Sequence, residues 1–393
     1  MRATVAHINL QNLQHNIQQI LSRVAGGAQL CVAVKANAYG HGAVPCAQAV
    51  LEAGASVLAV ATVDEGLELR EAGITAPILV LSLCTPQELP PLVAGGLTPL
   101  VFDSDYIALV AAEARSQGKR GFAVHLAVDS GMGRIGCYPE EAASLAKRIV
   151  TAEQGALTLG GICTHFAASD SPAREDEAYT EAQFARFCAA IDAVKGAGID
   201  TGLCHCANSA ASLDRPEMHL DMVRSGITTY GCYPCDKRRD YFASRGLAID
   251  LRPVMTLLTQ VVAVRSLKKG MSVSYGHTWT ASEDTTIGVL PVGYADGLLR
   301  RFAPYLRVSV TTADGERYVV PVRGRICMDQ CMVDFGALTE TQAARLRWSE
   351  AVLFGDTNAG AATSAQELSD AVGTISYEVT SAITQRVPRV FIA

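Results

Sequence analysis

Short apolar runs alternate with amphipathic stretches along roughly the first 230 residues of the chain. An apolar run of this kind between turn residues is typical of a buried strand, whereas apolar residues three and four positions apart indicate the packed face of a helix. We interpret the following runs as strands: 31–34, 57–61, 78–83, 99–102, 122–128, 160–165, 202–206 and 223–230. We interpret the following stretches as helices: 10–25, 44–52, 64–72, 106–117, 140–150 and 177–197.

Eight strands that alternate with helices predict a parallel sheet closed into a (β/α)8 barrel. The chemistry of such a barrel lies at the C-terminal ends of its strands. The side chains that fall at or just after predicted strand ends are Lys35, Arg134, His165, Ser209 and Arg224. We therefore expect these residues to share one site.

The pattern changes near residue 240, where Arg238, Arg239 and Asp240 mark a polar link that we expect to be exposed. Beyond it, runs rich in β-branched residues and divided by turn residues indicate strands. These runs are 254–264, 273–275, 285–290, 306–312, 317–322 and 332–335. The sequence thus predicts an α/β protein, with a barrel over residues 1–240 and a smaller, mainly β domain over residues 241–393.

The last 30 residues carry a helix signal. Ser364 with Glu367 three positions later has the spacing of a capping box, so a helix is expected over 364–371. A second short helix over 375–385 and a closing strand over 387–392 complete the predicted β domain.

Composition narrows the class of protein. The chain has 393 residues, 49% of them apolar, and a net charge of −6, so no basic field is available for nucleic acid. No apolar run reaches the ~18 residues that span a membrane. The first ten residues lack the long apolar region of a secretory signal. We expect a cytoplasmic protein.

Twelve cysteines are present, and most stand in apolar or strand-like runs, where a reduced thiol acts as a small hydrophobe. In Cys204-His205-Cys206 the two thiols share one face of a strand and the imidazole takes the other, which favours packing over metal binding. Cys232 and Cys235 form a lone C-x-x-C pair, and a redox role for them is left open.

One stretch stands out chemically. The apolar run 31–34 is followed at once by Lys35, then by small residues, Tyr39 and two glycines. Burial at a strand end lowers the pKa of a lysine, and a neutral amine is what a Schiff base requires. On spacing alone, a surface lysine before a glycine loop is the more ordinary interpretation.

This stretch resembles the pyridoxal phosphate (PLP) lysine motif of alanine racemases. Six further motifs recur in that family's order, so the resemblance covers almost the whole chain. They lie at 164–166, 205–211, 222–224, 273–276, 327–330 and 386–389. The resemblance implies a PLP-dependent isomerase that interconverts L- and D-alanine and supplies D-alanine for peptidoglycan.

The resemblance also assigns the cofactor contacts. Lys35 holds PLP, and Arg224 is the partner of the pyridine nitrogen. An arginine cannot release its proton in practice, so the ring nitrogen stays unprotonated and withdraws electrons weakly. The residues implied near the phosphate are Tyr39, Ser209, Gly226, Ile227 and Tyr377. Ser209 could equally cap a short helix that begins after it.

Racemisation needs a base on each face of a planar carbanion. The resemblance implies Lys35 for one face and Tyr275 for the other. A tyrosine has a pKa near ~10 and needs cationic neighbours to act as a base, for which His165 and Arg224 are the implied relay. Tyr275 lies in the predicted β domain.

The family provides the second base from a neighbouring subunit. In a head-to-tail dimer, the residues equivalent to Tyr275 and Met328 reach the other chain's site, while Arg134 lies near the substrate carboxylate. A homodimer with shared active sites and an amino-acid substrate is therefore implied.

One position departs from the family. A lysine, often carbamylated, usually stands two residues before Asp129, and here Ala127 replaces it. A chloride ion beside Arg134 is one expected substitute for the missing anion. Alternatives remain open: a serine or broad-specificity racemase, or a PLP-binding homeostasis protein on the same barrel, against which the β domain with Tyr275 argues.

Overall fold

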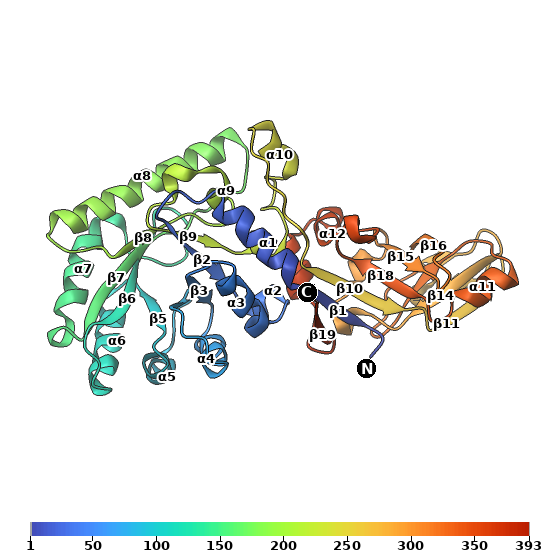
Figure 1. The fold of residues 1–393 in the computed structure, drawn as a ribbon, viewed down its shortest axis with the longest axis horizontal. Helices are drawn as coiled ribbons and strands as arrows, with labels where there is room; N and C mark the ends of the chain where they lie inside the picture. The colour runs from blue at the N-terminus through green and yellow to red at the C-terminus, as the bar shows by residue number, and fades with distance from the viewer. Residues whose placement is uncertain (1, 393) are drawn as a thin grey trace.

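The computed structural model describes residues 2–392, which form a barrel and a mainly β domain side by side along the long axis of the molecule (Figure 1). The eight barrel strands are β2 (Gln29–Ala33), β3 (Val57–Val60), β4 (Ile78–Val80), β5 (Thr98–Val101), β6 (Phe122–Ala127), β7 (Leu157–Cys163), β8 (Leu203–His205) and β9 (Met222–Ser225). They form a parallel sheet in the order β8-β7-β6-β5-β4-β3-β2-β9. The predicted barrel is confirmed.

The barrel is nearly closed between its end strands β8 and β9. Asp221 N donates to Cys204 O (3.0 Å) and Arg224 N donates to Ala207 O (2.9 Å). These bonds bring the end of β8 beside the end of β9, where predicted site residues cluster.

Helices cover the outside of the barrel. They are α1 (Leu10–Leu21), α3 (Ala43–Glu52), α4 (Val63–Glu71), α5 (Leu89–Ala94), α6 (Ser104–Ser116), α7 (Ala142–Thr151), α8 (Arg174–Gly196) and the short α9 (Ala211–Asp214). The helix α1 buries Leu13, Ile17 and Ile20, whereas Leu21, which the sequence places on the same face, is half-buried. The helix α5 was missed because two prolines open it, and proline is tolerated in the first turn of a helix.

The second domain contains three sheets. Its strands are β10 (Met255–Gln260), β11 (Ala263–Leu267), β12 (Ser272–Val273), β13 (Trp279–Thr280), β14 (Thr285–Leu290), β15 (Arg307–Thr311), β16 (Arg317–Pro321), β17 (Cys331–Asp334), β18 (Glu350–Phe354) and β19 (Arg389–Ile392). Its helices are α11 (Glu340–Leu346), α12 (Ala365–Val372) and α13 (Ser376–Ser381). The capping box of α12 is confirmed, since Ser364 N donates to Glu367 Oε2 (2.7 Å) and Glu367 N to Ser364 Oγ (3.1 Å).

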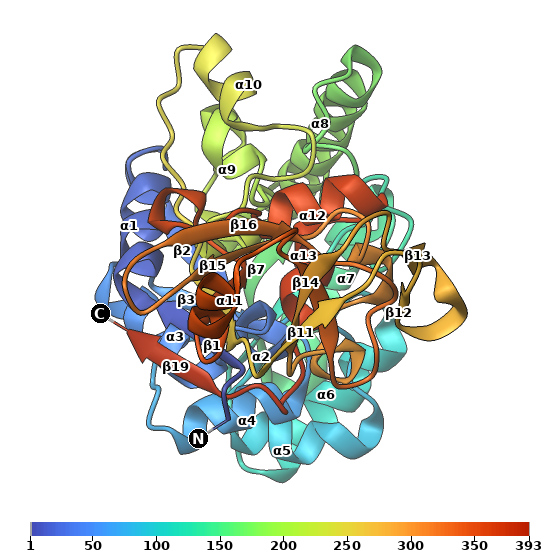
Figure 2. The ribbon, with the colours of Figure 1, turned by 90° about the vertical axis from the view of Figure 1, so that its right-hand side faces the viewer.

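The first strand, β1 (Val5–Asn9), belongs to a sheet of the second domain. It pairs antiparallel with β10 and parallel with β19 in a six-stranded sheet of order β16-β15-β18-β10-β1-β19 (Figure 2). The chain therefore starts between strands of the β domain and only then enters the barrel. The domain limits drawn at residue 240 stay a prediction.

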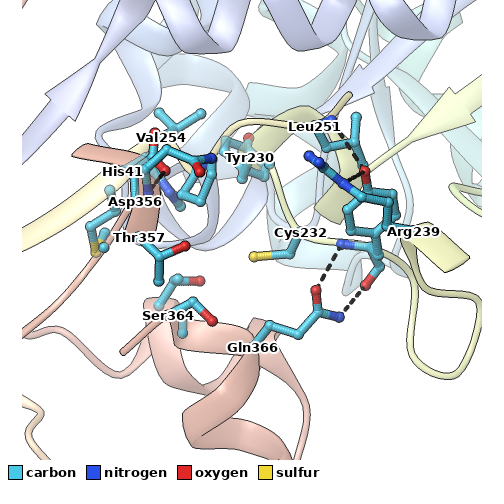
Figure 3. Close-up of a pocket in the computed structure, with 18 residues that line it drawn as sticks. His41, Tyr230, Cys232, Arg239, Leu251, Val254, Asp356, Thr357, Ser364 and Gln366 are labelled. Carbon is cyan, nitrogen blue, oxygen red and sulfur yellow. Dashed lines mark hydrogen bonds between the residues drawn. The ribbon is translucent and has the colours of Figure 1, made fainter. Parts of the chain in front are cut away.

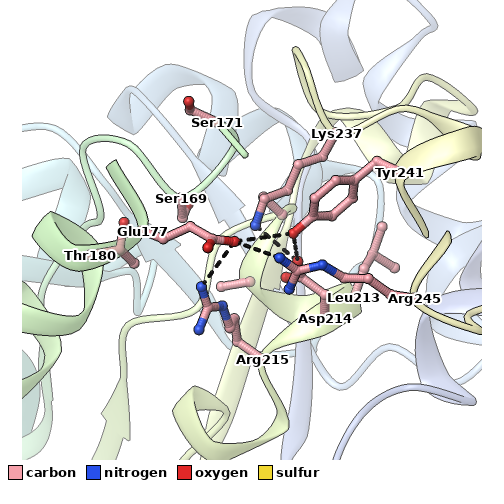
Figure 4. Close-up of polar contacts among 12 residues, drawn as sticks. Ser169, Ser171, Glu177, Thr180, Leu213, Asp214, Arg215, Lys237, Tyr241 and Arg245 are labelled. Atoms are coloured by element: carbon pink, nitrogen blue, oxygen red, sulfur yellow. Dashed lines mark hydrogen bonds and ion pairs between the residues drawn. The ribbon is translucent and has the colours of Figure 1, made fainter. Parts of the chain in front are cut away.

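The polar link near residue 240 is more ordered than the sequence suggested. Arg239 begins a short helix, α10 (Arg239–Ser244), and Lys237 before it forms a fully buried ion pair with Asp214 of α9 (2.9 Å). Tyr241 donates to the same Asp214 carboxylate (3.1 Å), as Figure 4 shows. These two contacts anchor the link on the barrel. Separating Lys237 from Asp214 would leave a buried charge without its partner, which is costly.

A cavity of about 260 Å³ lies where the two domains meet, and we call it the junction cavity (Figure 3). On its rim, Gln366 of α12 accepts from Tyr233 N (3.4 Å) and donates to Tyr233 O (3.0 Å), which ties the β domain to the barrel. Cys232 lines this cavity, and Cys232 and Cys235 are both free thiols.

Within residues 2–392, no helix has the length and apolar character needed to cross a bilayer. The cytoplasmic location expected from the sequence stays a prediction.

Candidate active site

A larger cavity, of about 510 Å³, opens at the C-terminal ends of the barrel strands, and we call it the barrel cavity. The predicted residues that line it are Lys35, Tyr39, Arg134, His165, Ser209, Arg224, Gly226 and Tyr377, with Ala127 beside them. Tyr275 and Met328 do not line it, and Ile227 is fully buried directly behind Gly226. The structure therefore brings together the barrel residues of the predicted site and Tyr377 of α13 (Ser376–Ser381) in the β domain, and leaves Tyr275 and Met328 outside.

Lys35 follows β2 and begins a single turn of left-handed helix, labelled α2 (Lys35–Tyr39). Ala36, Asn37 and Ala38 have φ values of 52–53°, and Tyr39 follows with φ 53°. Left-handed backbone costs roughly 1–2 kcal/mol for each L-residue, so this turn needs outside support. Strained backbone of this kind is concentrated at functional sites.

Side chains on both sides provide that support. Ala36 N donates to Glu65 Oε1 (2.6 Å), Ala43 N donates to Asn37 Oδ1 (2.8 Å), and His41 Nδ1 donates to Ala38 O (2.9 Å). The first and third bonds hold backbone groups of the turn itself, and the second ties the Asn37 side chain to the first residue of α3. The turn fixes where the chain leaves Lys35.

Burial lowers the pKa of Lys35, and the positive charge of Arg134 lowers it further, while the negative charge of Glu65 opposes both. Desolvation penalises the charged ammonium, and a nearby cation does the same. Lys35 therefore loses its proton more easily than a free lysine does, and the neutral amine is the form that reacts with a carbonyl carbon.

One end of the barrel cavity offers hydroxyl donors around a glycine. Ser209 Oγ accepts from Gly226 N (2.8 Å), so its own proton is free for a ligand. A Cβ atom at residue 226 would lie 2.7 Å from the Tyr39 hydroxyl, so only glycine leaves this space open. Burial raises the pKa of Tyr39 to about 12 and also raises that of Tyr377, so both phenols keep their protons. This set of donors suits a phosphate group.

Ser209 is not the cap of the following helix, because the N-cap of α9 is Ala210 and no side chain caps it. The side-chain oxygen of Asn208 accepts from Ala210 N (3.2 Å) and Ala211 N (3.3 Å). The hydroxyl of Ser209 therefore faces the barrel cavity without a capping duty.

Arg224 is a buried cation held by neutral acceptors. Its Nη1 donates to His205 Nδ1 (2.7 Å) and His205 O (3.1 Å). Its Nη2 donates to Thr164 O (2.8 Å), His165 Nδ1 (3.2 Å) and Cys206 O (3.2 Å). Because the four Nη protons are taken by protein acceptors, the Nε–H is the donor left for a ligand in the barrel cavity.

Two histidines of this network were missed by the sequence analysis. Since arginine only donates, His205 accepts at Nδ1, carries its proton on Nε2 and donates that proton to His125 Nδ1 (2.8 Å). A Cβ atom at Gly161 would lie 2.6 Å from His125 Cε1, so this glycine makes room for the ring. The available signal was that His205 points into the barrel, where a polar side chain needs a partner.

The histidines around Arg224 are neutral. Burial, followed by the charge of Arg224, lowers the pKa of His125 to about 4 and that of His165 to about 3, and holds that of His205 well below its usual value. Arg224 is therefore the permanent charge in this network, and the relay of His165 and Arg224 behind Tyr275 stays a prediction.

Tyr275 and Met328 share an exposed surface of the β domain. Their exposed fractions are 70% and 52%. Their loops are joined, since Ser274 Oγ donates to Arg325 O (2.6 Å), and the Arg325 guanidinium lies over Gly276. We call residues 274–277 and 325–328 the tyrosine surface.

Arg134 stands at the mouth of the barrel cavity, in a loop tied by Asp129. The Asp129 carboxylate accepts from the backbone N–H groups of Gly131 (2.9 Å), Met132 (2.9 Å) and Gly133 (3.1 Å). Ala127 is buried among apolar side chains, with Leu100 and Cys163 against it. Ala127 also lines the barrel cavity, together with Arg134 and Asp170, so the position of the missing lysine faces both apolar and charged side chains.

Comparison with known proteins identifies relatives over the whole chain. Residues 8–234 match the family described as alanine racemase, N-terminal domain, and residues 254–391 match alanine racemase, C-terminal domain. The chain is 46% identical over 394 residues to an alanine racemase of Treponema denticola, covering 100% of this chain and 99% of that one. It is 43% identical to an alanine racemase of Treponema pallidum, with both chains covered in full.

Solved structures agree with this result. The alanine racemase from D-cycloserine-producing Streptomyces lavendulae is 34% identical, with a TM-score of 0.88 over 100% of this chain and 98% of that one. The alanine racemase from Bacillus anthracis with bound L-Ala-P is 33% identical, with a TM-score of 0.88 over 100% and 96% of the two chains.

Proposed function

The chain belongs to the alanine racemase family, and from this premise we propose that it interconverts L- and D-alanine with bound PLP. The observation that carries the proposal is the barrel cavity, where a lysine with a lowered pKa, hydroxyl donors around Gly226 and the Nε–H of Arg224 all meet. As in its family, the D-alanine would serve peptidoglycan synthesis.

The residues present fit PLP. Lys35 would hold its aldehyde carbon. Arg224 would contact its ring nitrogen, and the residues that would hold its phosphate are Tyr39, Ser209, Gly226, Ile227 and Tyr377. The open space at Gly226 supports this placement, because a side chain there would displace the Tyr39 hydroxyl. When bound, PLP withdraws electrons from Cα and makes the α-proton of the substrate acidic.

Arg224 tunes that withdrawal. It would donate a hydrogen bond to the ring nitrogen without giving up its proton, so the nitrogen would stay unprotonated and the withdrawal moderate. Such moderate withdrawal would favour return of the proton to Cα. The buried guanidinium also stabilises negative charge in its surroundings, because a low-dielectric site strengthens electrostatic interactions.

Lys35 takes or returns the proton at Cα on one face of the substrate. Its lowered pKa supports this role, because a general base works best when its pKa lies near the working pH. Arg134 at the mouth of the cavity would orient the substrate carboxylate.

Tyr275 takes or returns the proton on the opposite face. His165 accepts from Arg224 at Nδ1, so its remaining proton lies on Nε2 and can be donated to the phenol oxygen. Arg224 would thus stabilise the phenolate through the neutral imidazole of His165, which keeps the relay of these two residues implied by the family resemblance.

A second copy of the chain would bring Tyr275 to the cavity. Tyr275 and Met328 are exposed together on the tyrosine surface, outside the barrel cavity of their own chain. A head-to-tail homodimer would give two sites, each built from the barrel of one chain and the tyrosine surface of the other. A C2 dimer uses each surface twice and so completes both sites.

The direct test is racemisation of a panel of L-amino acids by the PLP-loaded protein, followed by circular dichroism. Alanine should be racemised fastest. The panel includes serine and larger amino acids because Ala127 changes the surroundings of Arg134 and leaves a broader specificity open. Faster racemisation of serine would favour that alternative, and no racemisation of any amino acid would contradict the proposal.

A further inference from the structure

The carboxylate of Glu65 lies between the ends of two neighbouring barrel strands. It is half-buried, and its two oxygens accept three backbone N–H groups. Oε1 accepts from Ala36 N (2.6 Å), and Oε2 accepts from Ala61 N (2.7 Å) and Thr62 N (3.2 Å). The first donor follows β2 and the other two follow β3, so the carboxylate bridges both loops.

Helix capping explains only part of this arrangement. Glu65 is the third residue of α4 and forms a capping box with Thr62, in which each side chain accepts from the other's backbone N–H. That pattern accounts for the bond from Thr62 N. It does not account for the shorter bond from Ala36 N, which lies 29 residues away in the chain.

The bond to Ala36 acts on the peptide that follows Lys35. Ala36 is the first left-handed residue of the turn (φ 52°, ψ 50°), and its N–H belongs to the Lys35–Ala36 peptide. The orientation of this peptide sets the direction in which the Cα–Cβ bond of Lys35 leaves the backbone. An anionic acceptor is well suited to hold it, because hydrogen bonds to charged groups are stronger than those between neutral groups.

The charge of Glu65 also reaches the lysine. Burial and Arg134 lower the pKa of Lys35, and Glu65 is the group that opposes them. Removing this anion would lower the pKa of the Lys35 ammonium further.

We propose that Glu65 is a positioning residue for racemisation, whose carboxylate fixes the Lys35–Ala36 peptide and so aims the Lys35 side chain into the barrel cavity. This inference rests on the proposed role of Lys35. It assigns no contact with substrate to Glu65, which acts through the backbone.

The test compares Glu65→Ala, Glu65→Gln and Thr62→Ala in the PLP-loaded enzyme. Thr62→Ala is the matched control, because it removes the other half of the capping box and leaves the bond between Ala36 and Glu65 in place. For each variant, kcat and KM are measured in both directions across pH, the melting temperature is recorded, and the lysine that holds the cofactor is found by borohydride reduction and peptide mapping.

Glu65→Ala should lower kcat by about 10²-fold in both directions, the loss typical of a small misplacement of a reacting group, with a smaller change in KM. Glu65→Gln should retain part of the activity, since its amide oxygen still accepts a hydrogen bond. The acid limb of the kcat profile should move to lower pH in Glu65→Ala, because the Lys35 amine becomes neutral at lower pH. Thr62→Ala should lower the melting temperature and leave kcat and the limb unchanged.

The inference would be overturned if Glu65→Ala and Thr62→Ala have equal melting temperatures and both keep the wild-type kcat and pH profile. Glu65 would then act only as part of the helix cap. If Glu65→Ala does not fold, the test uses Glu65→Gln instead. A wild-type kcat in Glu65→Gln would then overturn the inference. Cofactor mapped to Lys35 with unchanged kcat contradicts only the role of Glu65. Cofactor mapped to another lysine contradicts the proposed function as well.

Discussion

Replacing Gly226 by alanine should weaken cofactor binding through a single steric contact. The new Cβ atom would lie 2.7 Å from the Tyr39 hydroxyl and 3.6 Å from Ser209 Oγ. Cβ atoms do not approach oxygen that closely, so the Tyr39 ring must move away from the phosphate end of the barrel cavity. Loss of one hydrogen bond to a charged group costs about 1.5–3 kcal/mol. That free energy corresponds to a Kd for PLP that rises about 10- to 150-fold.

The assay is a titration of the cofactor-free protein with PLP, followed by absorbance. A double-mutant cycle isolates the contact. Tyr39→Phe removes the same hydroxyl, so Gly226→Ala combined with Tyr39→Phe should bind PLP about as weakly as Tyr39→Phe alone. Residues in direct contact give such non-additive effects. Gly26→Ala is the matched control, because a Cβ atom at Gly26 would meet nothing within 4 Å.

An unchanged Kd in Gly226→Ala would refute the reasoning, and so would fully additive losses in the double variant. Either result would mean that Tyr39 does not hold the phosphate. Activity at saturating PLP should remain close to that of the wild type, because the reacting groups Lys35 and Arg224 lie elsewhere in the cavity.

Three further predictions concern pH, proton transfer and anions. Burial lowers the pKa of His125 from 6.5 to about 4, so its contribution to the free energy of unfolding is fully present above pH 6.5 and is lost as the pH falls toward 4, by on the order of 3 kcal/mol. In His125→Gln, the free energy of unfolding measured with denaturant should therefore fall less steeply between these pH values. The same slope as in the wild type would contradict this. Tyr275→Phe should slow α-proton exchange of one alanine enantiomer about 10²- to 10⁴-fold and the other far less, whereas equal small effects would argue against opposite faces for Tyr275 and Lys35. Replacing chloride by gluconate at constant ionic strength should weaken substrate affinity, because Arg134 would lose the anion that orients it. Ala127→Lys, if carbamylated, should make substrate affinity independent of chloride. Kinetics that do not change without chloride would rule the ion out.

Much of the fold follows from local patterns. Buried strands such as β14 and capped helices such as α12 can be predicted from about a dozen consecutive residues, because hydrophobic patterning and capping are local properties. The strand β1 cannot, since its partners β10 (Met255–Gln260) and β19 (Arg389–Ile392) both lie in the second domain, far along the chain. Its place in the β domain depends on long-range pairing that no short window contains.

The residues of the candidate site also divide into those that local sequence predicts and those that depend on long-range contacts. Lys35 and Arg224 could be found because their motifs resemble a known family and because they follow strands. The left-handed turn after Lys35 could not, since alanine on both sides of Asn37 disfavours this conformation and tertiary bonds impose it. The contact between His125 and His205 joins residues 80 positions apart, so only the closed barrel reveals it.

The measurement that tests the central claim most directly is complementation between two inactive proteins. Lys35→Ala and Tyr275→Phe are mixed under conditions in which subunit exchange has been demonstrated, and alanine racemisation is followed by circular dichroism. If each site takes Lys35 from one chain and Tyr275 from the other, a mixed dimer holds one site with both changes and one with neither. Random exchange of equal amounts should then restore about a quarter of the wild-type sites. No recovery of activity, despite proven exchange, would contradict the shared two-base site.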